Sequence, residues 1–246
     1  MQNNPFVMHI NMNGTNDCFR YIDKLASVWT NFSPVKLIIS ASSGGYMNTD
    51  YLLDDIRHGG AGWAQYSDDY SAVGYQLWVS GVTNGLLASS VSQSSILFFD
   101  GIETISNTIP NNLTHPSTAT NLAGYMSWGG HSSLGANYSV NGTLPWGTNC
   151  GWWIIETIES FNGFRVHSYA LAGFLDWFSP NSFAGTNYNY YNPPVGAVSY
   201  PDEPGGPSNG AIYFGEWARG KVFALCAWNS RLTPHLQAVG DPFVAR

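Results

Sequence analysis

The sequence predicts an α/β domain in which a mostly parallel sheet is flanked by helices. Apolar runs with strand character alternate along the chain with segments of helical spacing, a pattern typical of parallel sheets. Two of these runs, residues 125–128 and 152–158, end in small and polar residues, as buried strands do. The chain has 246 residues, which is enough for one such domain with a sizeable core. We therefore expect a single domain over residues 1–246.

The first part of the chain contributes three predicted strands and one helix. Residues 5–10, 37–40 and 50–56 have strand character, and residues 16–31 have the spacing of a helix. One face of this helix carries Phe19, Ile22, Leu25, Ala26 and Trp29.

The middle of the chain leads into the two central strands. Residues 71–79 are predicted to be helical, with a break at Gly81. Residues 94–99 form an apolar run that fits either a strand or a turn of buried helix, because so short a run has no decisive period. Residues 104–120 are rich in Asn, Thr, Ser and Pro and are predicted to be a surface loop.

The last third alternates again between helix and strand. Residues 168–178 have helical spacing, and residues 195–200 are predicted to be a strand. A helix is expected over residues 211–230, interrupted or kinked near Gly220, and a turn over residues 239–242.

Composition narrows the functional classes. The net charge is −7 and no cluster of Lys or Arg occurs, which argues against binding to nucleic acid. No apolar run approaches the ~20 residues that span a membrane.

Charged residues make up only 10% of the chain and aromatic residues 15%. This composition suits an extracellular or cell-envelope protein or a carbohydrate binder; a compositional habit of the source organism explains it equally well. Because the first residues lack the features of a signal peptide, we expect the chain to begin inside a longer protein.

The three cysteines do not have the spacing of a zinc site. Cys18 and Cys226 lie in apolar helical patterns and are expected to be buried thiols. Cys150 precedes the strand at 152–158, which would place it at the opposite edge of the sheet from the candidate site; it is an alternative nucleophile if the turn folds back toward His131.

Candidate catalytic residues follow the two central strands. His131 comes after the first strand and Ser160 after the second. In a parallel sheet both would emerge at one edge, where α/β proteins place their chemistry. His131 is a candidate general base and Ser160 a candidate nucleophile. The alternatives are a structural histidine and a serine that caps the turn.

Two carboxylates belong to the same strand and its end. Glu156 and Glu159 are three residues apart, which places them on opposite faces of a strand. A carboxylate inside an apolar strand is costly to bury unless it is paired, so Glu156 is expected either to orient His131 or to be paired with an Arg. Buried structural pairing is the alternative to a role in the site.

Small and aromatic residues near the strand ends are candidates for substrate binding: Trp128, Gly129, Gly130, Trp146 and Asn162. Trp146 and the tyrosines at 188, 190 and 191 are predicted to be exposed, where they can stack on sugars or bind a partner. Trp153 and Trp217 are expected in the core.

No cofactor is expected, although Asp54 and Asp55 belong to an oxygen-rich cluster that can bind calcium. The EF-hand spacing is absent, and solvated charges or a salt bridge to Arg57 are the simpler interpretation.

Four local motifs resemble an uncharacterised bacterial family related to the gingipain and clostripain peptidases. They are YMSWGGH at 125–131, IIETIESFNG at 154–163, VGAVSY at 195–200 and AVGDP at 238–242. The resemblance implies a caspase-like α/β fold and an N-terminally truncated domain. It also implies a catalytic histidine at His131 and a nucleophile at position 160, where the peptidases have Cys and this chain has Ser.

Two functions follow from these features. The first is hydrolysis of a peptide, amide or ester bond, with His131 and Ser160 as the catalytic pair and Glu156 or Glu159 orienting the histidine. The second is a non-catalytic descendant of the peptidase fold that binds glycans or a protein partner extracellularly. The oligomeric state is left open by the sequence.

Overall fold

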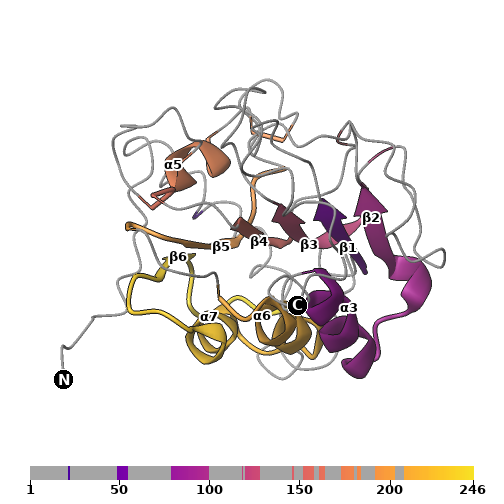
Figure 1. The fold of residues 1–246 in the computed structure, drawn as a ribbon. Helices are drawn as coiled ribbons and strands as arrows, with labels where there is room; N and C mark the ends of the chain where they lie inside the picture. Colours follow the sequence, from indigo (N-terminus) through magenta and orange to yellow (C-terminus); the bar gives the residue numbers. More distant parts are fainter. Residues whose placement is uncertain are drawn as a thin grey trace, which may run out of the picture.

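The computed structural model describes residues 22, 49–54, 79–99, 118, 120–127, 146, 152–157, 161–163, 173–179, 182–183, 192–202 and 208–246. These residues form a six-stranded sheet in the order β2-β1-β3-β4-β5-β6 (Figure 1). The first five strands run parallel, and the last is antiparallel to its neighbour. The strands are β1 (Asp50–Asp54), β2 (Ile96–Phe99), β3 (Leu122–Ser127), β4 (Ile154–Thr157), β5 (Gly196–Ser199) and β6 (Gln237–Gly240).

Helices lie on both faces of the sheet. In Figure 1, α3, α6 and α7 cover one face and the short helix α5 lies on the other. Their bounds, with that of one 3-10 turn, η1, are α3 (Val79–Ala88), η1 (Gln93–Ser95), α5 (Phe174–Trp177), α6 (Gly210–Ala218) and α7 (Phe223–Ser230). The prediction of an α/β fold with a mostly parallel sheet flanked by helices is confirmed.

The helix predicted to break at Gly81 instead runs through it. The described part of α3 begins at Val79 and continues to Ala88. A glycine inside a helix costs only about 1 kcal/mol, which packing can offset. Here α3 packs closely on α6: a Cβ at Gly85 would lie 2.6 Å from the carbonyl oxygen of Ala211.

The kinked helix predicted over residues 211–230 is two helices. Gly220 has a φ of +75°, a left-handed conformation that ends α6 and favours glycine. At the other end, Asn209 caps α6, because its side-chain oxygen accepts a hydrogen bond from the Ile212 amide at 3.2 Å.

The turn predicted over residues 239–242 begins later than expected. Val239 pairs with Ala197 and Gly240 with Gly196 in the antiparallel ladder, and the turn occupies residues 242–243. A strand of four residues ending in glycine has no recognisable alternation. It forms because it covers the otherwise unpaired edge of β5.

The sheet carries two apolar layers. On the α6 and α7 side, glycines let aromatic rings approach the strands: a Cβ at Gly124 would lie 2.8 Å from the Phe214 ring, and one at Gly196 would lie 2.6 Å from the Phe223 ring. Trp153, Trp217 and Cys226 are buried, as predicted.

Several predictions fall outside the described residues: the strands at 5–10 and 37–40, the two cysteines Cys18 and Cys150, and the tyrosines at 188, 190 and 191. Ile22 is helical, as predicted, and its side chain is 46% exposed. The ambiguous run at 94–99 is a strand from Ile96 onward.

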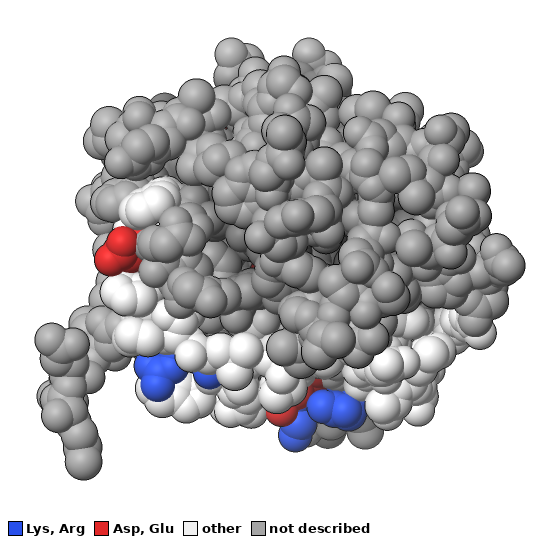
Figure 2. All heavy atoms as spheres, in the orientation of Figure 1, with Lys and Arg blue, Asp and Glu red and all other residues white. Residues whose placement is uncertain are grey.

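Charged side chains are sparse on the described surface. Figure 2 shows the described Lys and Arg side chains of this face in two small groups along its lower edge, over the α6 and α7 layer. Arg219, Lys221 and Arg231 belong to this part of the chain and are exposed.

Candidate functional site

The carboxyl ends of the parallel strands meet at one edge of the sheet. Ser127, the last residue of β3, is paired with Asp54 of β1 on one side and with Thr157 of β4 on the other. The strand order reverses between β1 and β3, because β2 lies beyond β1 and the later strands lie beyond β3. Ligands of open α/β sheets bind outside the carboxyl ends at such a switch point. The carboxyl edge at β1, β3 and β4 is therefore the candidate site.

Most of the predicted catalytic residues lie outside the described residues. These are His131, Ser160 and Glu159, together with Trp128, Gly129, Gly130 and Asp55. What the structure does establish is where their strands end. His131 follows Ser127 by four positions, and Ser160 follows Thr157 by three, so both segments start from paired residues at the same edge.

The predicted ligand residue Asn162 lies in a tightly held turn at this edge. Its side-chain amide donates to the Thr157 hydroxyl oxygen at 2.6 Å and its side-chain oxygen accepts from the Tyr200 amide at 2.7 Å. Asn162 has no exposed surface, and its own carbonyl accepts a hydrogen bond from the Phe174 amide at 2.8 Å. Asn162 therefore joins β4, the end of β5 and the start of α5, so its side chain is used in holding the fold.

The residues on either side of Asn162 fix the same turn. Phe161 has a φ of +61°, which is costly for a residue with a side chain. Gly163 donates its amide to the Tyr200 carbonyl at 3.0 Å, and a Cβ there would lie 2.7 Å from the Pro201 nitrogen. The backbone at 161–163 is thus held in one conformation immediately after position 160.

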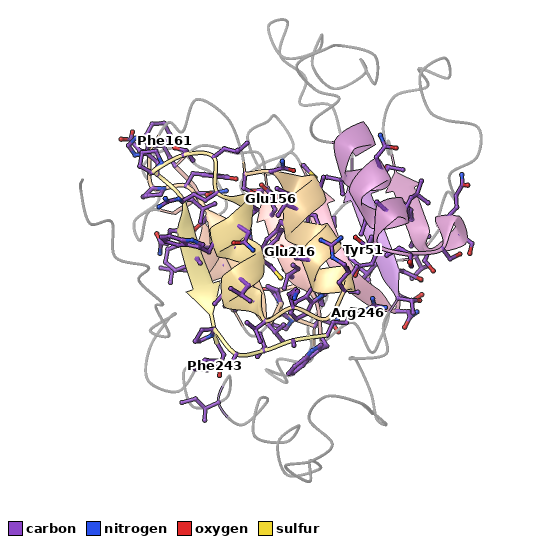
Figure 3. The ribbon with its side chains drawn as sticks, turned by 90° about the horizontal axis from the view of Figure 1, so that it is seen from below. Tyr51, Glu156, Phe161, Glu216, Phe243 and Arg246 are labelled. Atoms are coloured by element: carbon purple, nitrogen blue, oxygen red, sulfur yellow. The ribbon has the colours of Figure 1, made fainter. Side chains whose placement is uncertain are left out.

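Glu156 is fully buried, and its partners are hydroxyl groups. Its Oε1 atom accepts from the Tyr200 phenol at 2.9 Å and from the Ser208 hydroxyl at 2.5 Å. The Tyr200 phenol oxygen in turn accepts from the Ser208 amide at 2.6 Å. The other carboxyl oxygen of Glu156, Oε2, has no hydrogen-bond partner among the described residues. Figure 3 shows Glu156 inside the protein, on the face of the sheet that α6 covers.

Burial dominates the electrostatics of this carboxyl group. It raises the pKa of Glu156 from 4.5 to about 7, and the hydrogen bonds from Ser208 and Tyr200 offset only part of that effect. Burial, together with the nearby Glu156 carboxylate, also raises the pKa of the Tyr200 phenol well above its usual value. His131, one of the partners that the sequence suggested for Glu156, lies outside the described residues, and no arginine within them forms a hydrogen bond with this carboxyl group.

Tyr200 and Ser208 were missed by sequence reasoning. They lie 44 and 52 residues beyond Glu156 and come together only through the pairing of β4 with β5 and the position of α6. The available signal was weak: a tyrosine ends an apolar strand, and a serine immediately precedes the residue that caps a helix.

The prediction that Trp146 is exposed is wrong. Its side chain is 8% exposed and packs against Tyr125, Trp153 and Phe183, with ring centroids 4.6–5.5 Å away. This cluster lies on the face of β3 and β4 opposite Glu156, because residues alternate along each strand. The indole fills the core because burying so large an apolar side chain is favourable.

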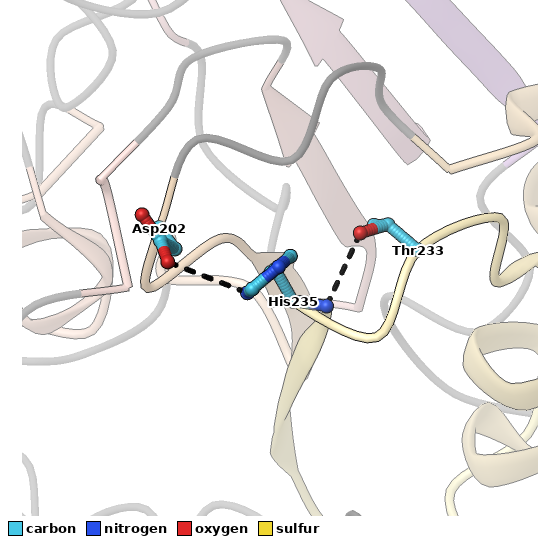
Figure 4. Close-up of polar contacts among 3 residues, drawn as sticks. All are labelled: Asp202, Thr233 and His235. Atoms are coloured by element: carbon cyan, nitrogen blue, oxygen red, sulfur yellow. Dashed lines mark hydrogen bonds and ion pairs between the residues drawn. The ribbon is translucent and has the colours of Figure 1, made fainter.

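A histidine and an aspartate that the sequence did not single out meet at the same edge. His235 Nδ1 lies 3.6 Å from an Asp202 carboxylate oxygen, and the His235 amide donates to the Thr233 hydroxyl at 3.2 Å (Figure 4). The side chains of His235 and Asp202 are 42% and 58% exposed. Asp202 follows β5 and His235 precedes the antiparallel β6, which is why the pair lies at the carboxyl edge.

Within the described ranges, no group of three or more His, Cys, Asp or Glu side chains is placed to hold a metal ion. The Asp54 side chain and the whole of Asp55 lie outside the described part of the protein, so the calcium site stays a prediction. None of the helices in the described part of the chain is long and apolar enough to cross a membrane.

Comparison with known proteins finds no family model, no curated protein and no solved structure that matches this chain.

Proposed function

We propose that the protein is a hydrolase that cleaves a peptide, amide or ester bond at the carboxyl edge of its sheet. The observation that carries this proposal is the pairing of Ser127 with Thr157. Because these two residues are neighbours in the sheet, the segments that contain His131 and Ser160 begin at adjacent points on one edge, beside the switch point of the sheet.

We also propose that the fold is caspase-like. The mostly parallel sheet with helices on both faces supports this proposal, because the resemblance implies such an architecture. The strand that ends at Ser127 then carries the histidine, and the strand that ends at Thr157 carries the nucleophile position, as the resemblance implies.

In this mechanism His131 is the general base and Ser160 the nucleophile. The imidazole takes the hydroxyl proton while Ser160 Oγ bonds to the substrate carbonyl carbon. The same proton then goes to the leaving amine or alcohol as its bond to carbon breaks. Backbone N–H groups of Gly129 and Gly130 stabilise the oxyanion, and Glu159 orients the imidazole. Water subsequently hydrolyses the acyl group from Ser160.

Glu156 has a structural place in this proposal. A carboxyl group with no exposed surface and two hydroxyl donors does not contact a substrate. Its contribution to the site is therefore indirect, through the residues that it holds.

Covalent labelling tests the proposal. The folded protein is treated with a fluorophosphonate and, separately, with iodoacetamide, and the modified residues are mapped by mass spectrometry. Labelling of Ser160 that is lost in His131→Ala supports the proposal. His235→Ala is the matched control, because His235 lies at the same edge and is paired with Asp202; this variant is expected to keep the labelling.

Two outcomes would overturn the proposal that the protein is a serine hydrolase. Rapid alkylation of Cys150 would make that residue the nucleophile. The absence of selective labelling at either residue would instead favour the non-catalytic alternative, a glycan- or protein-binding domain, and binding assays would replace the substrate screen.

A further inference from the structure

Tyr200 connects two parts of the candidate site. Its phenol donates to Glu156 Oε1 at 2.9 Å, on the face of the sheet that α6 covers. Its backbone amide donates to the Asn162 side chain at 2.7 Å, and its carbonyl accepts from the Gly163 amide at 3.0 Å. A displacement of Tyr200 as a whole away from Glu156 would therefore act on the turn at 161–163.

That turn has little freedom to adjust. Phe161 is held at a positive φ, and Gly163 lies so close to Pro201 that a Cβ would be 2.7 Å from its nitrogen. The turn follows Ser160 directly in the sequence. A displacement of Tyr200 would thus change the backbone next to the proposed nucleophile.

We propose that Glu156 is a positioning residue, which fixes the turn at 161–163 through Tyr200 and holds it most firmly when its carboxyl group is protonated. The inference rests on the proposed function only in assigning the adjacent Ser160 as nucleophile.

The dependence on protonation follows from the surroundings of the second carboxyl oxygen. Within the part of the chain that the structure describes, Oε2 has no hydrogen-bond partner. It faces Gly210, where a Cβ would meet Oε2 at 3.4 Å, the Val82 side chain at 2.7 Å and the Met126 sulfur at 3.6 Å. An ionised oxygen in these apolar surroundings is poorly solvated. The two hydroxyl donors bind an ionised Oε1 more strongly, but the cost of burying the charge outweighs them. Ionisation therefore favours a local opening in which Tyr200 leaves Glu156 and water reaches the carboxylate.

The charges around Glu156 do not reverse this direction. The titratable groups that face it among the described residues are two phenols, Tyr200 from the end of β5 and Tyr213 from α6. Burial, together with the charge of Glu156, raises the pKa of both. From β3 and α3, Met126 and Val82 lie beside Gly210, the residue that Oε2 faces, and neither of them titrates. Burial raises its pKa to about 7 in the closed structure.

Amide hydrogen exchange of the intact chain, measured from pH 4.5 to pH 7 and expressed as protection factors, tests the inference. Gly163 reports opening of the turn, and Ile155 in β4 reports opening of the core. Because opening exposes Glu156, the protection factor of Gly163 is expected to fall up to about tenfold per pH unit across this interval. In Glu156→Gln, which retains an acceptor oxygen but does not titrate, it is expected to be constant.

Two further variants separate positioning from general stability. Tyr200→Phe removes the hydroxyl group that joins Glu156 to the turn. The protection factor of Gly163 is therefore expected to lose its pH dependence, while that of Ile155 retains it. Ser208→Ala removes the other hydrogen bond to the same oxygen, and Gly163 is expected to remain pH-dependent. The inference is overturned if, in the wild type, the protection factors of Gly163 and Ile155 have the same value and the same dependence on pH. It also fails if Glu156→Gln keeps the fall at Gly163.

The exchange experiment needs no substrate and no catalytic activity. A failure of fluorophosphonate labelling at Ser160 would therefore overturn the proposed function and leave the exchange result standing. A constant protection factor at Gly163 alongside normal labelling would overturn only the role of Glu156.

Discussion

Glu156 and Tyr200 share a hydrogen bond of 2.9 Å that lies wholly inside the protein, although 44 residues separate them in the chain. The carboxyl group belongs to β4 and the phenol to the residue that follows β5, and the parallel pairing of Glu156 with Val198 brings them together. Because the bond connects a titratable group to the backbone of the candidate site, it makes both stability and site geometry sensitive to pH.

Replacing Glu156 by Gln should remove part of the pH dependence of folding. The pKa of Glu156 is raised from 4.5 to about 7 in the folded protein. Since the folded state then binds this proton more tightly than the unfolded chain, stability from this group is complete below pH 4.5 and is lost as pH rises to about 7. The loss amounts to about 3 kcal/mol. Urea unfolding at a series of pH values measures it.

The control for this prediction is Glu216→Gln, which alters an α6 carboxylate that accepts hydrogen bonds from Asn229 at the surface. It leaves Glu156 intact and should keep the wild-type decline in the free energy of unfolding. A Glu156→Gln variant that declines as steeply as the wild type would contradict the prediction.

Asn162→Ala should destabilise the protein by about 3 kcal/mol, because it leaves the buried Tyr200 amide without its acceptor and the Thr157 hydroxyl without its donor. The free energy of unfolding at constant pH is the measurement. Asn229→Ala removes an exposed amide that bonds to Glu216 and should cost less than about 1 kcal/mol. Equal losses in the free energy of unfolding for the two variants would show that the hydrogen bonds of Asn162 do not stabilise the fold.

Much of the sheet could be predicted because its strands are apolar and bounded by turn residues. The runs that became β3 and β4 were recognised in this way, and so was the strand at 195–200. β6 escaped, because four residues ending in Gly240 carry no period and form a strand only by pairing with β5. The position of Gly81 inside a helix was not predicted for a related reason: the packing of α3 on α6 outweighs the low helix propensity of glycine.

The candidate site was predictable only where a residue breaks the pattern of its own strand. Glu156 stood out because a carboxylate in an apolar run must find partners. The identity of those partners depends on register and on the position of α6, which no local pattern encodes. Asn162 was expected to bind a ligand, whereas the structure uses its amide inside the protein.

Gly163→Ala should destabilise the turn by about 3 kcal/mol. The new methyl group would lie 2.7 Å from the Pro201 nitrogen and 2.8 Å from the Tyr200 carbonyl carbon, and backbone atoms cannot move aside as a flexible side chain can. Thermal unfolding followed by circular dichroism measures the change.

Gly220→Ala provides the comparison for this substitution. There the nearest atom is 3.6 Å away, so only the positive φ of +75° opposes alanine, at a cost of about 1 kcal/mol. If Gly220→Ala proves the more damaging of the two, close contact with Tyr200 and Pro201 is not what requires glycine at position 163.

Trp146→Ala should cost about 4 kcal/mol of stability, because it opens a cavity among Tyr125, Trp153 and Phe183 on the face of the sheet opposite Glu156. Trp228→Ala removes the same side chain from a site that is 49% exposed, where Arg231 lies over the indole at 4.5 Å, and should cost about 1 kcal/mol or less. The free energies of unfolding of the two variants decide between a core and a surface role. Were Trp146→Ala as stable as Trp228→Ala, the indole would be available at the surface, and stacking on a sugar would again be an explanation for it. The larger loss expected for Trp146→Ala would leave any aromatic binding surface to residues other than Trp146.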